Sequence, residues 1–94
     1  MLVFEWDDEK NRRNRAKHGV SFEDAKAVFS DLFMMENFDD RFGYNEERVV
    51  SVGMKSRGLL TVANTQRNQL RRIISARPAT RHETDDYFTN RSCT

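Results

Sequence analysis

The middle of the sequence carries cations without any acid beside them. From Arg48 to His82 there are eight Lys or Arg residues and no Asp or Glu, whereas the first 47 residues hold seven Lys or Arg and twelve Asp or Glu. Cations without anionic neighbours predict a surface that binds phosphates or an acidic partner. The alternative is a solvated basic face that the acidic N-terminal half neutralises in the folded chain.

Arginine, lysine and histidine side chains together suit the chemistry of phosphodiesters. Cleavage of RNA by its own 2'-hydroxyl needs a base, an acid and cations that stabilise the pentacovalent phosphorane, and no metal is obligatory. Arginine suits the cationic role best because its planar fork binds two phosphate oxygens and keeps its charge. Histidine or lysine can transfer the protons.

Four residues are candidates for these roles. His18, beside Lys17 at a predicted helix end, is a candidate for proton transfer, although a histidine there also suits a structural cap of the last carbonyl groups. Arg67 lies in a predicted turn and Arg77 just before the last predicted helix, and both are candidates for phosphate binding. The alternatives are a solvated turn arginine at 67 and, at 77, an arginine that binds neighbouring carbonyl groups or acids. The remaining cations of the basic segment are candidate contacts to RNA: Arg48, Lys55, Arg57, Arg71, Arg72 and Arg81.

Other site chemistries lack their residues. The four glycines are scattered, so the chain has no phosphate-cradling loop, and it has no G-x-S-x-G elbow. His18, His82 and Cys93 are distant from one another and lack metal-ligand spacing, and acid pairs such as Asp7-Asp8 suit caps and turns. We therefore expect no metal and no cofactor. The single cysteine also excludes a disulfide within the chain.

Length and composition fit one small domain over residues 1–94. Apolar residues make up 37% of the chain and charged residues 33%, which predicts a thin core. The sequence lacks the run of about 20 apolar residues that a membrane span needs. Because acids follow almost at once after the first residues, we expect no signal peptide and a cytoplasmic location.

The elements that must position these residues follow from the pattern of apolar and capping residues. Alternation and β-branched runs predict strands over 2–6, 32–38, 48–54, 59–64 and 70–76. Asp7 and Gly19 bound a helix that ends at about His18, Ser21 caps a second helix, and Pro78 suits the first turn of a last helix. The first helix has almost no apolar residue, so it must lie on the surface or be held by polar contacts.

This order of strand, two helices, four strands and helix is typical of an α+β fold. We expect a small antiparallel sheet of four to five strands, with the two N-terminal helices packed on it and a C-terminal helix. Such a sheet is about as much core as a chain of this length can bury, and its other face stays open to a partner.

Two segments carry a resemblance to a known family. They are Lys17-His18-Gly19-Val20-Ser21-Phe22 and, later in the chain, Ile73-Ile74-Ser75-Ala76-Arg77 with Ala79-Thr80-Arg81 and Glu83. Together with Phe4-Glu5-Trp6-Asp7 near the start, they closely resemble the BrnT toxin family. The resemblance covers essentially the whole chain.

The resemblance implies the toxin of a bacterial type II toxin-antitoxin pair, with a RelE-like fold and a ribonuclease activity that inhibits translation. It also implies a partner, a BrnA-like antitoxin, which neutralises the toxin by binding it in a heterotetramer with an antitoxin dimer. Operator DNA would then be bound only through the antitoxin. Lys17, His18, Arg67 and Arg77 match positions of the family's motifs.

One departure from the family concerns the general base. Family members commonly have a glutamate in the turn where this chain has Gln66 and Gln69. The departure favours a second hypothesis, a non-catalytic RNA-binding or antitoxin-binding module that has lost cleavage. Such a module retards RNA with steep salt dependence and leaves it intact. A third hypothesis, a purely structural subunit, leaves the anion-free segment unexplained.

Overall fold

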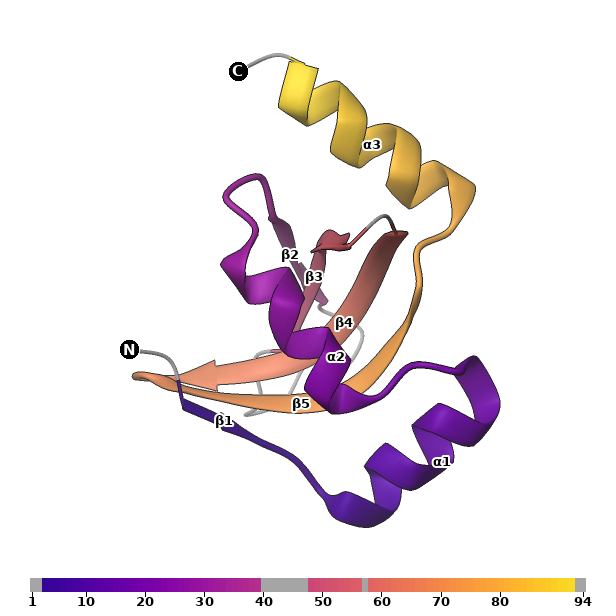
Figure 1. Cartoon of the computed structure of the whole chain (residues 1–94). Helices are drawn as coiled ribbons and strands as arrows, with labels where there is room; N and C mark the ends of the chain where they lie inside the picture. The colour runs from indigo at the N-terminus through magenta and orange to yellow at the C-terminus, as the bar shows by residue number, and fades with distance from the viewer. Residues whose placement is uncertain (1–2, 40–47, 57, 93–94) are drawn as a thin grey trace.

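The computed structural model describes residues 3–39, 48–56 and 58–92, and within them the fold is α+β, with five strands and three α-helices (Figure 1). The helix near the C-terminus is among them. In chain order the elements are β1 (Val3–Glu5), α1 (Asp8–His18), α2 (Phe22–Ala25), the 3-10 helix η1 (Lys26–Ser30), β2 (Met35–Asp39), β3 (Arg48–Lys55), β4 (Gly58–Arg67), β5 (Leu70–Pro78) and α3 (Arg81–Ser92). No helix in these ranges is long and apolar enough to cross a membrane.

The five strands form one mixed sheet in the order β1-β5-β4-β3-β2. Strands β2 to β5 pair antiparallel, as the sequence predicts, but β1 pairs parallel with β5. The expectation of a wholly antiparallel sheet is therefore wrong. A short hairpin loop forces neighbouring strands to run antiparallel, whereas β1 and β5 are joined through the whole of the intervening chain, which leaves either direction open to them.

Polar contacts hold α1 in place, as its composition predicts. The Asp7 carboxylate accepts hydrogen bonds from the amides of Glu9 (2.8 Å) and Lys10 (3.2 Å) at the start of the helix, and Gly19 ends it with a φ of 72°. The only buried residue of α1 is Asn14. Its side-chain amide donates to the carbonyl groups of Val20 (2.8 Å) and Ala76 (2.7 Å).

Asn14 also completes the edge of β5. The pairing of β1 with β5 stops at Arg72, so the backbone of Ala76 lies beyond the reach of that strand. The Asn14 side chain fills this place, because its oxygen accepts from the Ala76 amide (3.1 Å) while its nitrogen donates to the Ala76 carbonyl. The side chain thus makes the two bonds that a neighbouring strand would make.

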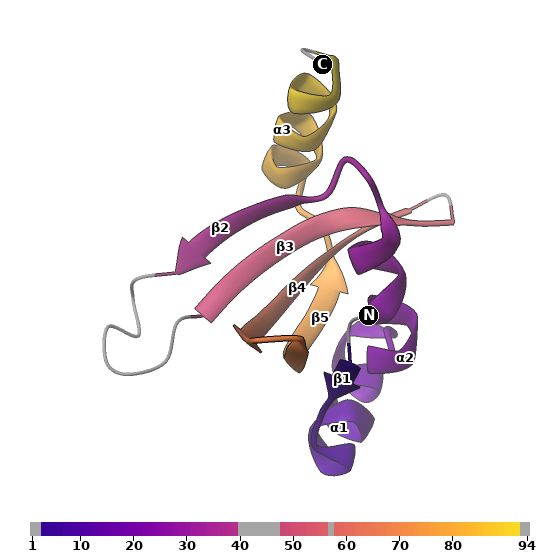
Figure 2. The same cartoon turned by 90° about the vertical axis from the view of Figure 1, so that its left-hand side faces the viewer.

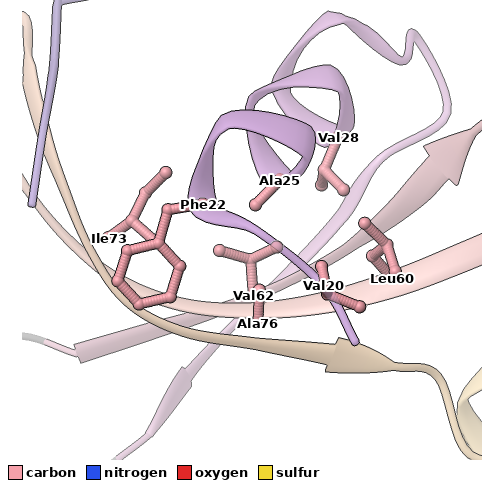
Figure 3. Packing of buried hydrophobic residues seen from close by; sticks show 8 residues of the cluster. All are labelled: Val20, Phe22, Ala25, Val28, Leu60, Val62, Ile73 and Ala76. Carbon is pink, nitrogen blue, oxygen red and sulfur yellow. The ribbon is translucent and has the colours of Figure 1, made fainter. Parts of the chain in front are cut away.

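The helix that Ser21 caps is a single α-helical turn that continues as η1. It packs on the sheet, and the resulting core contains the buried residues Val20, Phe22, Ala25, Val28, Leu60, Val62, Ile73 and Ala76 (Figure 3). Gly53 of β3 permits this close approach. A Cβ atom at Gly53 would lie 2.8 Å from Cγ1 of Val28 and 3.0 Å from the Val28 carbonyl oxygen, so any larger residue would push η1 off the sheet.

The last helix starts later than predicted. Pro78 belongs to β5 and pairs with Leu60, and the Ala79 amide still donates to the Leu59 carbonyl (3.0 Å). The Thr80 side chain then accepts from the amide of Glu83 (3.1 Å), which starts α3. The prediction that Pro78 opens the helix is wrong. A proline is tolerated at the very end of β5 because its missing amide proton costs little there.

Replacement of Asn14 by alanine is expected to destabilise the fold by about 2–4 kcal/mol, because it leaves the buried amide and carbonyl of Ala76 without partners. Urea unfolding followed by circular dichroism measures this change. The matched control is the exposed neighbour Arg15→Ala, which should change the free energy of unfolding by at most about 0.5 kcal/mol. Equal stability of the two variants would contradict the role given to Asn14.

Candidate functional site

The face of the sheet opposite α2 and η1 presents three rows of paired residues across β3, β4 and β5. Side chains alternate between the two faces of a sheet, so the strand register assigns these rows. We call this surface the open face; its rows are Val52, Thr61 and Arg77, then Val50, Ala63 and Ser75, then Arg48, Thr65 and Arg72. Helix α3 lies next to the first row, in which Val52 and Thr61 are buried (Figure 2). Small side chains thus form a floor between Arg77 and the basic third row.

Arg77 has one edge of its guanidinium bound and another available. Its Nη1 and Nη2 atoms donate to the two carboxylate oxygens of Glu83 at 2.8 and 3.0 Å, and Nη1 also donates to the Pro78 carbonyl at 3.3 Å. No described residue accepts a hydrogen bond from Nε. The side chain is 39% exposed, so the edge formed by Nε and Nη2 can bind two oxygens of a phosphate.

The Glu83 carboxylate is saturated with donors. Besides Arg77, its Oε1 atom accepts from the Thr61 hydroxyl (2.9 Å) and from the Thr80 amide (2.8 Å). The pKa of Glu83 is lowered from 4.5 to about 2, chiefly by the Arg77 guanidinium and also by the Thr80 and Thr61 bonds, against partial burial. The same pair raises the pKa of Arg77. At neutral pH Glu83 is therefore a bound anion and a weak base.

Cations occupy the other end of the open face. Arg72 is exposed and its Nη1 lies 3.2 Å from the Glu5 carboxylate on β1, while Arg48 is half-buried on β3. Arg67 is exposed at the end of β4, two residues beyond Thr65 and hence on the same face. Ion pairs as exposed as Arg72–Glu5 are weak and can exchange for a phosphate.

Helix α1 runs beside β5 in the same direction (Figure 1). The amides of Lys10 and Glu9 chiefly lower the pKa of Asp7. Helix α1 begins near Arg72, because Glu5, three residues before the helix, pairs with Arg72. Further along the helix, Asn14 reaches Ala76. His18, one helical turn after Asn14, is half-buried. Lys17 is exposed on the neighbouring flank of α1.

The donors on this surface suit an anion. In the described part of the chain, no group of three His, Cys, Asp or Glu side chains is placed to hold a metal ion. The open face instead offers guanidinium groups around a floor of small side chains, an arrangement that can accommodate a phosphodiester chain and stabilise added negative charge on it.

Comparison with known protein families matches residues 6–83 to the family described as "Ribonuclease toxin, BrnT, of type II toxin-antitoxin system". The chain belongs to the BrnT family. The resemblance predicted from the sequence is thereby confirmed, and the matched segment includes both Arg77 and Glu83. Membership of a type II toxin-antitoxin family implies an antitoxin as partner. No curated protein matches the chain.

The structure divides the predicted RNA contacts of this BrnT-family protein between different surfaces. Lys55 lies on the face covered by α2, where its Nζ is 3.1 Å from a carboxylate oxygen of Asp24. Arg71 lies on that same face and its side chain is only 6% exposed. Arg81 is exposed at the first residue of α3, and Arg57 lies outside the described residues.

Arg71 belongs to an internal polar cluster. Its Nη1 atom donates to Glu36 (2.5 Å) and Asn64 (3.0 Å), its Nη2 atom donates to Gln66 (2.7 Å), and its guanidinium lies 4.5 Å from the centre of the Phe29 ring. These contacts tie β2, β4 and β5 together beside η1. The Gln66 side chain therefore points to the face opposite that of Arg77.

Glu83 is the residue of this site that the sequence reasoning did not select. A signal for it exists, because Thr80 and Glu83 have the Thr-x-x-Glu spacing of a helix capping box. Both bonds of that box are present, from the Glu83 amide to the Thr80 hydroxyl and from the Thr80 amide to the Glu83 carboxylate. A capping-box glutamate reaches back past the start of its helix, and here it meets the end of β5.

The lowered pKa of Glu83 predicts a pH-dependent contribution to stability. The contribution is complete above the unfolded pKa of 4.5 and is lost as the pH falls towards about 2, because protonation breaks the pair with Arg77. For a part-exposed pair we expect about 1–2 kcal/mol. Urea unfolding of wild type and Glu83→Gln at pH 7, 4 and 2.5 measures it. The difference between the two proteins should shrink with falling pH, and a constant difference would contradict the assignment.

Proposed function

We propose that this BrnT-family protein is a metal-independent endoribonuclease whose RNA site is the open face. The observation that carries the proposal is that Glu83 binds Nη1 and Nη2 of Arg77, which leaves the Nε and Nη2 edge without an acceptor among the described residues, in the row next to Ala63 and Ser75. A guanidinium edge in that position binds two non-bridging phosphate oxygens of an RNA strand lying on the floor.

The reaction is attack of a ribose 2'-hydroxyl on the adjacent phosphorus. A base removes the hydroxyl proton, the phosphorane gains negative charge, and an acid protonates the departing 5'-oxygen, which leaves a 2',3'-cyclic phosphate and a 5'-hydroxyl. Arg77 stabilises the phosphorane because its charge is permanent and its bond to Glu83 raises its pKa further.

For proton transfer we propose His18. It is half-buried and lies one helical turn after Asn14, which binds β5, whereas Lys17 is exposed. Lys17 remains the second candidate. Histidine side chains are suited to both proton steps at neutral pH.

Binding of the rest of the RNA strand falls to the cations at the other end of the open face. We assign Arg48, Arg67 and Arg72 to its phosphates, with Arg81 beside the site at the start of α3. Lys55 and Arg71 are left out of this set, because both have acidic partners on the other face. Arg77 and the third row lie four strand residues apart along β4, about 13 Å, so the strand crosses the floor between two cationic ends.

The partner and the wider role follow from the family. We propose a cytoplasmic toxin of the RelE-like group that inhibits translation by cutting RNA and is neutralised by a BrnA-like antitoxin covering the open face. Two toxins and an antitoxin dimer would form a heterotetramer that binds operator DNA only through the antitoxin. Coverage of a cationic surface by an acidic or phosphate-like partner would block RNA directly.

A binding-only protein remains the second candidate function. It is favoured by Gln66 and Gln69, which stand where family members commonly have an acid. A ribonuclease cleaves the RNA that it binds, whereas a binding-only protein leaves it intact.

Incubation of the antitoxin-free protein with RNA in EDTA should produce 2',3'-cyclic phosphate ends. Arg77→Ala should lower kcat by about 10²–10³-fold, because it removes the charge at the phosphorane. The control is Arg12→Ala, an exposed cation of α1 that pairs with Glu9, and its kcat should stay within about twofold of wild type. Intact RNA in the presence and absence of ribosomes would favour the binding-only protein.

The salt dependence of binding identifies the residues that contact phosphates. With a 2'-O-methyl RNA that cannot be cleaved, Arg67→Gln and Arg72→Gln should each reduce the slope of log K against log salt by about 0.7. Lys26→Gln is the matched control, because Lys26 pairs with Glu23 on the helix-covered side, and its slope should equal that of wild type. Unchanged slopes for Arg67→Gln and Arg72→Gln would exclude these arginines from the RNA site.

A further inference from the structure

The contacts of Glu83 join α3, β4 and β5 at one carboxylate. It receives two bonds from Arg77 on β5, one from the Thr61 hydroxyl on β4 and one from the Thr80 amide at the start of α3. Thr61 is 4% exposed, so the carboxylate is held from the buried side of the site. With four donors, Glu83 has little capacity left to accept a proton from a substrate.

Helix α3, which carries Glu83, is itself fixed to the sheet. One turn after Glu83, the wholly buried Tyr87 donates its hydroxyl proton to Asp31 (2.6 Å). The same Asp31 oxygen accepts from the amide of Met54 on β3 (2.8 Å). The position of Glu83 is therefore set by packed elements on both sides.

We propose that Glu83 is a positioning residue of the ribonuclease site, which holds the guanidinium of Arg77 so that its Nε and Nη2 edge faces the scissile phosphate. This inference rests on the proposed function. Glu83 occupies the Nη1 and Nη2 edge through two parallel bonds, and a planar guanidinium bound in that way can present only its side edge to a second anion. Without the carboxylate, the long Arg77 side chain is free to turn away from the floor.

We expect replacement of Glu83 to lower kcat only when Arg77 is present. Glu83→Gln places an amide group, itself a donor, against a guanidinium nitrogen, so the paired geometry is lost. We expect kcat to fall about 10–100-fold with KM changed less than about threefold, since the alignment matters most in the transition state. Glu83→Asp keeps the charge but draws the carboxylate back by one methylene, and we expect an intermediate kcat.

The deciding experiment is a double-mutant cycle of Glu83→Gln and Arg77→Ala. If Glu83 acts through Arg77, Glu83→Gln should not lower kcat further in the Arg77→Ala protein. Equal losses of kcat from Glu83→Gln in the two backgrounds would overturn the inference, because they would show an effect on the whole fold. Unchanged kcat in both Glu83 variants, with active wild type, would overturn it too.

A control and a second readout separate this inference from the proposed function. Ser21→Ala removes the side-chain cap of α2 on the other face of the sheet and leaves the Arg77 bonds intact, so it should lower Tm by about 4–8 °C with kcat unchanged. Binding of 2'-O-methyl RNA in the same cycle tests the alignment without chemistry. Wild type that binds this RNA but cleaves none contradicts the proposed function, and additive binding losses in the cycle contradict the role of Glu83.

Discussion

The side chain of Asn14 is the contact on which the arrangement of the first helix depends. Helix α1 has no apolar stripe, so burial of hydrophobic surface cannot dock it, and Asn14 is its only buried residue. Because one amide group satisfies both the amide and the carbonyl of Ala76 and also binds Val20, it places three segments relative to one another. The chain then enters the core at Val20 and Phe22.

The sheet separates cations that are indistinguishable in the sequence. Arg71 and Arg72 are adjacent and belong to the same anion-free segment, yet alternation along β5 directs them to opposite faces. Arg71 becomes an internal cation that binds Glu36 on β2, whereas Arg72 stays exposed. The acids of the N-terminal half thus neutralise part of the basic segment, as the alternative interpretation of its charge predicted. Arg67, Arg72 and Arg81 stay exposed.

What could be predicted from the sequence was local. Asp7 and Gly19 define α1 because capping depends on a few adjacent residues, and β-branched alternation defines β3 to β5 for the same reason. The parallel direction of β1 and the place of Pro78 in β5 depend on pairing between distant segments, which no local pattern contains. The same limit applies to the site, since Arg77 was selected from its type whereas its partner Glu83 became evident only with α3 in place.

The register of β4 also shows what a glutamate at position 66 would contact. Position 66 alternates with Thr65 and Arg67, so its side chain lies on the helix-covered face, where Gln66 accepts a bond from Arg71. An acid there would face Arg71 and not the floor beside Arg77. Its absence therefore removes no group from the open face at that position. In the proposed reaction Glu83 is a poor proton acceptor, because four donors bind its carboxylate and its pKa is about 2. We proposed His18 of α1 as the group that transfers protons, and Asn14, one turn earlier, fixes this helix against β5, so the docking of α1 bears on the proposed chemistry.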